Sequence, residues 1–251
     1  MRHIIIGDVH GCLAELEELI SLLSPAADDK LYFIGDLVDK GPDSAGVVQY
    51  VRRLAENQPL ILVLGNHEEK LLRFIQHKET QSAALQQMKN TEKLELLMGQ
   101  LSTADIQFLS SAYINYIIVE AGVCLLHGGI PGNNKTDLSV NNPYSLDVFK
   151  KLKGAELILK TRFLDQAGNF VSLGQEDESS VFWSEVYDGH FGKVIFGHHP
   201  VVAAEPTVFP NAINIDTGCV FGGWLTACVI ENNQISFKNV KAKQAYATAN
   251  P

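Results

Sequence analysis

The sequence has only four cysteines among its 251 residues, and no two of them form a Cys-x-x-Cys pair. Without such pairs or a dense cysteine framework, a disulfide-stabilised secreted domain and a cysteine-ligated zinc site are both disfavoured. We therefore expect buried free thiols in a reducing compartment at Cys12, Cys124, Cys219 and Cys228.

Long apolar runs are also missing. No segment approaches the ~20 consecutive apolar residues that a membrane-spanning helix requires. No basic and apolar leader precedes the first expected strand, which begins at His3. We expect a cytoplasmic protein with no membrane partner.

Positive charge is scarce, because 20 Lys and Arg residues stand against 29 Asp and Glu residues, for a formal net charge of −9. Proteins that coat nucleic acids or anionic membranes obtain their affinity largely from Lys and Arg, so a nucleic-acid partner is not expected. A phosphate-bearing substrate remains compatible with the composition, since bound metal ions can supply positive charge locally.

Short apolar strands alternate with amphipathic helices in the first quarter of the chain. Strands are expected at "RHIIIGD", "KLYFIGD" and "PLILVLGN", with helices at residues 13–23 and 43–57. This alternation predicts parallel strands joined by right-handed crossovers, and therefore an α/β fold. The length suits one domain, which we place at residues 1–240, followed by a loose tail at 241–251.

The composition changes between residues 68 and 112. Proline is absent between Pro59 and Pro131, and glycine is absent from residue 66 to residue 98. We expect two or three helices here as a small cap-like insertion, with Ser102 or Thr103 as an N-cap. Hairpins are expected at residues 114–129 and around Asn232-Asn233, further strands at "KVIFGHHP" and "AINIDTGC", and a mixture of loop and helix at 130–180.

Polar residues of the metal-ligand type follow the predicted strands. They lie in the segments "GDVHG", "GDLVDKG", "GNHE", "HGG" and "GHHP", and they comprise Asp8, His10, Asp36, Asn66, His67, His127 and His198. Sites in open α/β sheets form beyond the carboxyl ends of the strands, so these residues are expected to converge. Mixed oxygen and imidazole ligands suit manganese, iron, zinc or related divalent ions.

Two ions can share these ligands. Asp8 and His10 are two residues apart on an extended segment, so both point the same way and would bind one ion. Asp36 could bridge this ion to a second one through its two oxygens. The second ion would be completed by Asn66, His127 and His198.

In this order, these motifs resemble those of the calcineurin-like metallophosphoesterases, and within them the phosphoprotein phosphatase branch. The later segment "NIDTGCVFGGWLTA" is similar to bacterial members, which include serine/threonine phosphatases, dinucleoside tetraphosphatases and the phosphatase module of polynucleotide kinase-phosphatases. The resemblance covers most of the chain and implies an α/β/β/α fold, a β-sandwich flanked by helices. It also implies two metal ions, with manganese preferred over iron or zinc, bound by Asp8, His10 and Asp36 and by Asp36, Asn66, His127 and His198.

A phosphatase mechanism gives roles to two further residues. A metal-bound water, whose pKa can fall to ~7, would attack phosphorus. His67 would act as general acid, and Asp39 would favour its imidazolium form and fix its orientation. The family resemblance supports the same assignment for Asp39.

Basic residues are candidates for binding the substrate phosphate. We assign this role to Lys40 and Arg162, with Arg73 as a weaker alternative to Arg162. Relatives usually carry Arg at the position of Lys40, so the planar bidentate fork is lost here. His199 stands where bacterial relatives often have Thr, and either a substrate contact or a structural role is compatible with it.

The main prediction for function is hydrolysis of phosphate monoesters by a bacterial-type serine/threonine protein phosphatase, acting on phosphorylated proteins or small phosphoesters. The alternative is hydrolysis of dinucleoside polyphosphates such as diadenosine tetraphosphate. Symmetrically cleaving relatives often lack a carboxylate at the position of Asp39, whereas asymmetrically cleaving relatives keep it. A polynucleotide-end phosphatase and an inactive metal-binding scaffold are further alternatives. An aspartic protease would need a second copy of "IDTG", which the sequence does not contain.

Overall fold

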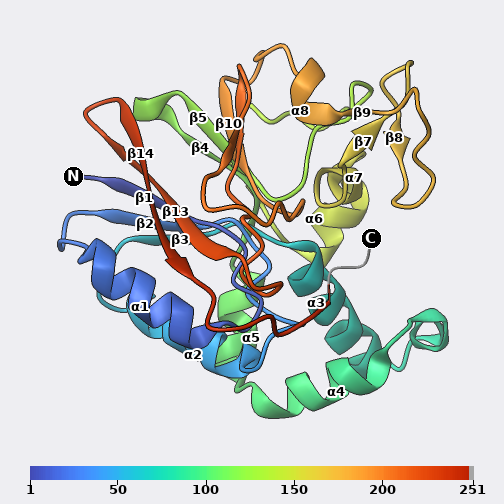
Figure 1. The fold of residues 1–251 in the computed structure, drawn as a ribbon. Coiled ribbons are helices and arrows are strands. Elements are labelled where there is room, and N and C mark those ends of the chain that lie inside the picture. Colours follow the sequence, from blue (N-terminus) through green and yellow to red (C-terminus); the bar gives the residue numbers. More distant parts are fainter. Residues whose placement is uncertain (249–251) are drawn as a thin grey trace.

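The parallel strands expected near the N-terminus belong to the first of two main sheets, and the expected crossover helices connect them (Figure 1). The structure is a computed structural model that describes residues 1–248. The parallel strands are β1 (His3–Ile6), β2 (Lys30–Phe33) and β3 (Leu60–Leu62), joined by α1 (Leu13–Leu23) and α2 (Ser44–Ala55). The predicted hairpin of β13 (Trp224–Glu231) and β14 (Gln234–Lys241) pairs antiparallel with β1 and completes the order β14-β13-β1-β2-β3.

The second sheet is built from the later strands and has the order β11-β12-β10-β5-β4-β6. Its strands are β4 (Tyr113–Ile118), β5 (Val123–Leu126), β6 (Asn142–Pro143), β10 (Lys193–Phe196), β11 (Thr207–Val208) and β12 (Ala212–Asn214). The expected hairpin is confirmed, since β4 and β5 pair antiparallel across the short 3-10 helix η2 (Val119–Ala121). β10 runs parallel to both β5 and β12.

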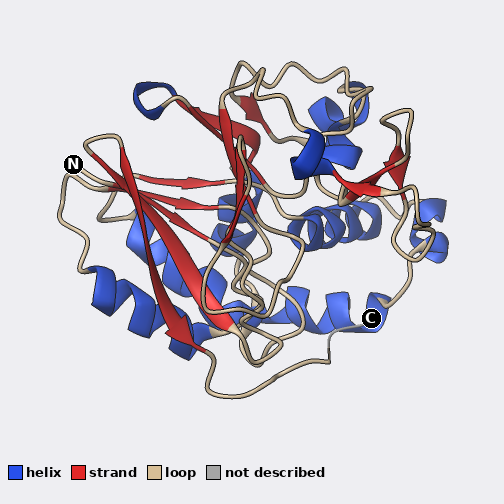
Figure 2. Ribbon diagram, turned by 45° about the horizontal axis from the view of Figure 1, so that its top comes forward, coloured by secondary structure: helices blue, strands red, loops and turns tan. Residues whose placement is uncertain are grey.

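The two sheets pack face to face, and helices cover their outer sides (Figure 2). Alternation along the strands separates the two faces, because Ile5 and Tyr32 belong to the core between the sheets while Ile4, Ile6 and Phe33 belong to the core beneath the helices. Burial of each large apolar side chain stabilises the folded state by ~1.5–3 kcal/mol. A shift of one residue would move these side chains to the opposite face, so the alternation fixes the register of each strand. The predicted β-sandwich flanked by helices in one domain is confirmed.

Residues 68–112 are helical, as expected. The segment lies within α3 (Asn66–Glu79), the 3-10 helix η1 (Ala83–Gln87), α4 (Thr91–Gln100) and α5 (Thr103–Ser110). Ser102 is the N-cap of α5, and its hydroxyl accepts a hydrogen bond from the backbone nitrogen of Asp105. Asp105 also accepts a hydrogen bond from Nε of Arg52 at 2.8 Å, which ties α5 to α2. In Figure 1, α3 and α4 lie together at the lower right.

Residues 130–192 contain strands that the sequence pattern did not predict. Besides α6 (Leu146–Lys151), α7 (Ala155–Ile158) and α8 (Trp183–Val186), this region forms a small sheet of β7 (Phe163–Leu164), β8 (Phe170–Val171) and β9 (Val181–Phe182). Each of these strands has two residues, which is too short for a hydrophobic period to be recognised.

The segment after β14 is held against the domain, although we expected a loose tail. The carboxylate of Glu15, which is fully buried, accepts hydrogen bonds from Lys243 N at 2.9 Å and from Tyr246 Oη at 2.8 Å. The backbone nitrogens of Tyr246 and Ala247 donate to the carbonyl of Val220. A buried carboxylate requires donors, and these residues supply them. Residues 249–251 of the predicted tail lie outside the described residues.

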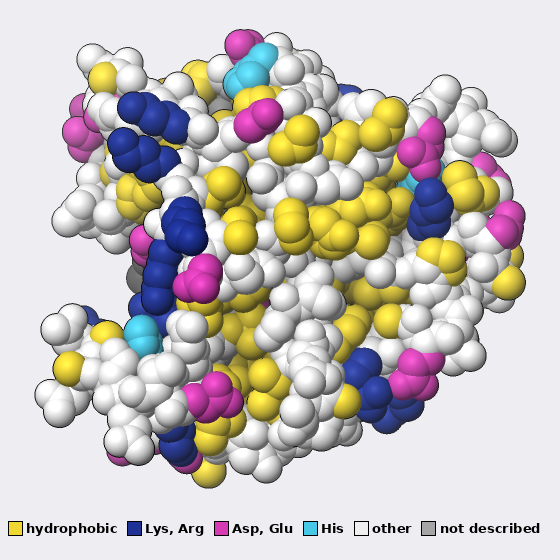
Figure 3. Space-filling view, turned by 180° about the vertical axis from the view of Figure 1, so that it is seen from behind, with side chains coloured by type: hydrophobic (Ala, Val, Ile, Leu, Met, Phe, Trp, Pro, Cys, Tyr) yellow, Lys and Arg dark blue, Asp and Glu magenta, His cyan; other side chains and the backbone are white. Residues whose placement is uncertain are grey.

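Charge is unevenly distributed over the surface. Seen from behind, Lys and Arg side chains gather beside a recess at one edge of the molecule, whereas Asp and Glu side chains are scattered (Figure 3). All four cysteines are free and buried, as predicted. None of the helices within residues 1–248 combines the length and apolar character that a bilayer crossing requires.

Candidate dinuclear metal centre

Most of the predicted metal ligands lie at one edge of the sandwich, where strands of both sheets end. The loops after β1 and β2 carry Asp8 and Asp36, the loops after β5 and β10 carry His127 and His198, and Asn66 begins α3. Parallel strands β1 and β2 end at the same edge of their sheet, and β5 and β10 end together in the other. Both sheets therefore contribute side chains to a single site.

Close backbone contact between two loops brings Asp36 next to Asn66. A Cβ atom on Gly65 would lie 2.2 Å from the backbone nitrogen of Asp36, and one on Gly35 would lie 2.5 Å from the nitrogen of Gly65. Gly35 also has φ of +95°, a conformation that L-residues rarely adopt. The glycines of "GD" and "GN" thus allow the two strand ends to approach each other.

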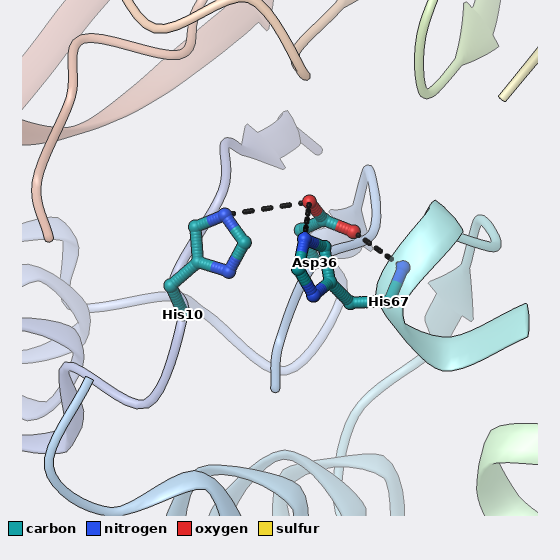
Figure 4. A group of neighbouring side chains, drawn as sticks. All are labelled: His10, Asp36 and His67. Atoms are coloured by element: carbon teal, nitrogen blue, oxygen red, sulfur yellow. Dashed lines mark hydrogen bonds and ion pairs between the residues drawn. The ribbon is translucent and has the colours of Figure 1, made fainter. Parts of the chain in front are cut away.

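The carboxylate of Asp36 is the centre of the site. It is 1% exposed, and its Oδ2 lies 3.3 Å from Nε2 of His10 and 3.8 Å from Nε2 of His67. Its Oδ1 lies 3.4 Å from Nε2 of His127. Figure 4 shows the rings of His10 and His67 beside this carboxylate. Two groups of potential ligands, His10-Asp36-His67 and Asp36-His127-His198, each have their ligand atoms within 4.8 Å of one another and share Asp36.

Hydrogen bonds to backbone carbonyls set the tautomers of two histidines. Nδ1 of His10 donates to the carbonyl of Val38 at 2.9 Å, and Nδ1 of His127 donates to the carbonyl of Ile34 at 2.9 Å. A carbonyl can only accept, so Nδ1 carries the proton, and Nε2 of a neutral ring is then an acceptor. Both Nε2 atoms face Asp36, and a hydrogen bond from the other ring nitrogen to a carbonyl is common in metal-binding histidines.

The donor set fits divalent cations. Nε2 of His127 lies 3.0 Å from Oδ1 of Asn66, so these two potential ligand atoms are adjacent. Burial alone would lower the pKa of His127, yet Asp36 and Asp8 raise it to about 9, so the site stabilises positive charge at this position. In contrast, burial lowers the pKa of His10 to about 3, which leaves its ring neutral and able to bind a metal.

Asp8 lies beside these two groups rather than within them. Its carboxylate accepts a hydrogen bond from the backbone nitrogen of His198 at 3.1 Å, and neither ligand group includes it. Burial and then the nearby Asp216 raise the pKa of Asp8, and burial raises the pKa of Asp216 to about 6. Three carboxylates, including Asp36, are therefore buried in one region, and their mutual repulsion favours bound cations.

The predicted general acid and its partner are in contact. Nδ1 of His67 lies 2.9 Å from Oδ2 of Asp39, and the ring of His67 is 18% exposed. The hydrogen bond from His67 holds the pKa of Asp39 well below its usual range, so Asp39 is a carboxylate. Nε2 of His67 faces Asp36, and its ring therefore connects the metal ligands to the solvent-accessible side of the site.

Both predicted phosphate contacts reach the site. Nζ of Lys40 lies 2.8 Å from Nε2 of His10. Nη2 of Arg162 donates to the carbonyl of His198 at 2.8 Å, while its buried Nε has no hydrogen-bond partner among the described residues. Burial lowers the pKa of Arg162, whereas Asp216 and the other site carboxylates act to raise it. The guanidinium is therefore close enough to these carboxylates to be attracted by them.

The two alternative candidates lie elsewhere. Nε of Arg73 donates to Glu69 at 2.9 Å within α3, so this arginine forms an ion pair rather than a site contact. The ring of His199 packs against Phe182 with centroids 4.6 Å apart, and burial lowers its pKa to about 4. This environment is that of a packed, neutral histidine.

Glu68 has a role that the sequence analysis did not identify. It is fully buried, and its carboxylate accepts hydrogen bonds from four backbone nitrogens: Asp36 at 2.7 Å, Leu37 at 2.8 Å, Val38 at 3.1 Å and Gly65 at 3.1 Å. Burial and Asp36 raise its pKa, which these amides oppose. Glu68 thus holds the loop that carries Asp36. The sequence shows only an acid at the end of "GNHE", which does not specify its partners.

Several of the site residues have strained backbones. Positive φ angles occur at His10 (46°), Asp36 (50°), Asp39 (70°), Lys40 (67°) and His198 (69°). Such conformations cost of order 1 kcal/mol or more each and persist where surrounding contacts impose them. The concentration of strain at these residues indicates that the loops are shaped for function.

Comparisons with known proteins show similarity in sequence and in fold. A family model described as calcineurin-like phosphoesterase matches residues 1–214. The chain is 30% identical over 260 residues to the bis(5'-nucleosyl)-tetraphosphatase PrpE [asymmetrical] of Oceanobacillus iheyensis, covering 98% of this chain and 94% of that protein. A crystal structure provisionally named a diadenosine tetraphosphatase aligns with a TM-score of 0.72 and 28% identity, covering 96% of this chain and 93% of the other. A serine/threonine phosphatase of Saccharomyces cerevisiae aligns with a TM-score of 0.62 at 13% identity, covering 97% and 81%.

Proposed function

Because the chain belongs to the calcineurin-like phosphoesterase family of metal-dependent phosphoric ester hydrolases, we propose that it hydrolyses dinucleoside tetraphosphates asymmetrically. The observation that carries this proposal is similarity along nearly the whole chain to a relative with that name, at 30% identity. From the sequence we preferred a serine/threonine phosphatase, but the similarity to the yeast serine/threonine phosphatase structure is only 13% in sequence. That similarity supports a common fold and no common substrate. The comparisons therefore favour the alternative over the main prediction.

The proposed cofactor is a pair of divalent ions, for which manganese is our first choice. Such ions supply positive charge to the phosphoryl oxygens and acidify water for attack on phosphorus. The residues that would hold them are Asp8, His10, Asp36, Asn66, His127 and His198. His67, which belongs to one ligand group, is assigned instead to proton transfer because Asp39 occupies its other nitrogen.

The remaining site residues bind and orient the reacting groups. Lys40 and Arg162 would bind phosphate oxygens, since both cations lie beside the ligand groups. His67 donates through Nδ1 to Asp39, so its Nε2 is the atom that would transfer a proton to the leaving oxygen. Glu68 keeps the loop of Asp36 in place. Asymmetric cleavage of the tetraphosphate then yields a nucleoside monophosphate and a nucleoside triphosphate.

The test is product analysis. The purified protein with manganese is incubated with diadenosine tetraphosphate, and the products are separated by anion-exchange chromatography. We expect AMP and ATP in equal amounts, with turnover lost in Asp36→Asn. ADP as the sole product would contradict asymmetric cleavage. No turnover, under conditions where p-nitrophenyl phosphate is hydrolysed, would exclude the proposed substrate.

A second candidate function, phosphomonoester hydrolysis, is favoured by the contact of 2.9 Å between His67 and Asp39. A nucleotide leaves as a weak base and needs little protonation, whereas an alkoxide leaving from a phosphomonoester needs an acid. A phosphoserine peptide included in the same assay distinguishes the two functions. Turnover of the peptide exceeding that of diadenosine tetraphosphate would establish this candidate as the principal activity.

A further inference from the structure

A cavity of about 300 Å³ opens beside the general acid and its partner. One wall is formed by Asp39, Lys40 and His67, and the other by α4 of the 68–112 segment. Pockets for small ligands begin at roughly this volume. The helical segment therefore completes a concavity that is continuous with the catalytic residues.

The cavity is cationic, although the chain as a whole is acidic. Lys40, Lys70 and Lys93 line it, and the only acidic lining residue is Asp39, which already contacts His67. Within residues 1–248, none of the three lysines forms an ion pair with a carboxylate. Three cationic side chains that no carboxylate neutralises, of which Lys40 also contacts His10, favour a polyanionic ligand beside a phosphoesterase site.

Helical spacing directs these side chains toward one another. Lys70 follows His67 by three residues on α3, so both lie on the same face of that helix. On α4, Lys93, Leu96, Leu97 and Gln100 recur at intervals of three and four residues and also share a face. The contact between α3 and α4 places these two faces on either side of the cavity.

The wall of α4 also offers apolar surface. Leu94 and Leu97 are 9% exposed and belong to the core, whereas Leu96 is 70% exposed. An exposed leucine next to a lysine-lined cavity is suited to pack against the flat face of a nucleobase. The lining therefore combines the acid and its partner, three lysines and apolar leucine surface.

We propose that this cavity binds the part of a nucleoside polyphosphate that lies beyond the cleaved bond. The proposal rests on the function proposed above and specifies how the substrate is recognised. Lys40, Lys70 and Lys93 would bind successive phosphates, and Leu96 would contact the distal nucleoside. Lysine ammonium groups act as point charges with rotatable donors, so they suit a flexible chain of phosphates. The 68–112 segment is thereby the determinant of substrate length.

The experiment compares Lys70→Ala/Lys93→Ala with the wild-type protein. A matched control removes two exposed lysines outside the cavity, Lys89→Ala/Lys238→Ala. Each protein is loaded with manganese and assayed for hydrolysis of p-nitrophenyl phosphate, which lacks the polyphosphate chain that the proposal places on the lysines of α3 and α4. The inhibition constant of diadenosine tetraphosphate in that assay is measured, together with KM for its own hydrolysis.

We expect the cavity variant to raise both constants about tenfold or more, the effect of losing one or two charged hydrogen bonds. Its kcat/KM for p-nitrophenyl phosphate should stay within about twofold, as should every parameter of the control. Unchanged constants in the cavity variant, or an equal rise in the control, would overturn the subsite. A raised inhibition constant in proteins that do not cleave diadenosine tetraphosphate would uphold the subsite and refute only the proposed reaction.

Discussion

Replacement of Glu68 by glutamine tests whether a buried carboxylate organises the metal centre. Its Oε2 accepts from the nitrogens of Asp36 and Gly65, and its Oε1 accepts from those of Leu37 and Val38. Glutamine retains one oxygen and places an NH₂ group where the other stood. Two of the four backbone N–H groups would then be buried without an acceptor.

The magnitude follows from the number of lost acceptors. Each unsatisfied buried donor costs ~1–3 kcal/mol, and two cost about 2–6 kcal/mol. Relief of the desolvation of a buried charge returns part of this cost, so the net loss should be about 2–4 kcal/mol. For a protein of this size, ~1 kcal/mol lowers Tm by about 2–4 °C, so we expect a decrease of about 5–15 °C.

The assay is thermal unfolding in the presence of a chelator, followed by manganese titration of each folded protein by calorimetry. Glu68→Gln should bind manganese more weakly, because the loop of Asp36 is no longer fixed. The control is Glu69→Gln, which removes the ion pair between this buried carboxylate and Arg73 on the same helix and should leave metal affinity unchanged. A Glu68→Gln protein that melts with the wild type and binds manganese equally well would refute the reasoning.

Three further variants test other parts of the structure. Asp36→Asn should lose both turnover and bound metal, and the metal content is measured by elemental analysis after gel filtration. Two retained ions per chain would show that Asp36 is not the bridge. His67→Asn should keep its metal content while turnover of alkyl phosphates falls at least ~10²-fold, with a smaller loss for diadenosine tetraphosphate, and equal losses for both substrates would contradict its role as acid. Burial opposes ionisation of Asp29, but hydrogen bonds from Arg2 and Ala26 lower its pKa in the folded protein. The ionised carboxylate therefore stabilises the folded state fully above the unfolded pKa of ~3.9, and this stabilisation is lost as pH falls through the lower folded pKa. Asp29→Asn should therefore unfold ~1–3 kcal/mol more easily than the wild type at pH 7, and the difference should shrink below about pH 4 in denaturant titrations.

The position of the metal centre was predictable because it depends on local patterns. Glycine followed by a polar residue ended several apolar strands, and parallel strands bring such ends to one edge. The contact between His67 and Asp39 was also within reach, because both residues belong to motifs at that edge. The helix cap at Ser102 followed from the same kind of local information.

Other features depend on contacts between distant residues. An acid near the start of a helix usually accepts hydrogen bonds from amides of that helix, so "GNHE" gives no indication that Glu68 reaches the loop of Asp36. The closest contact of Glu68 in that loop is with the nitrogen of Asp36, more than thirty residues earlier in the chain. The positive φ angles of His10 and His198 are imposed by surrounding packing and have no sequence signature of the kind that glycine provides. The same is true of the contact between Tyr246 and Glu15, which joins the two ends of the domain.

The proposed polyanion subsite is compatible with an acidic chain, because Asp39 is the only acidic residue that lines the cavity. Asp8, Asp36 and Asp216 are buried at the centre, where divalent ions would neutralise them, and Glu68 is enclosed by backbone amides. Charges on exposed acids farther than ~8 Å from the cavity would be largely screened at physiological ionic strength. The phosphates beyond the cleaved bond would instead meet the three lysines of the cavity at short range. On this proposal, the local arrangement of α3 and α4 would set the potential that the substrate meets, and the net charge of the protein would be a poor guide to it.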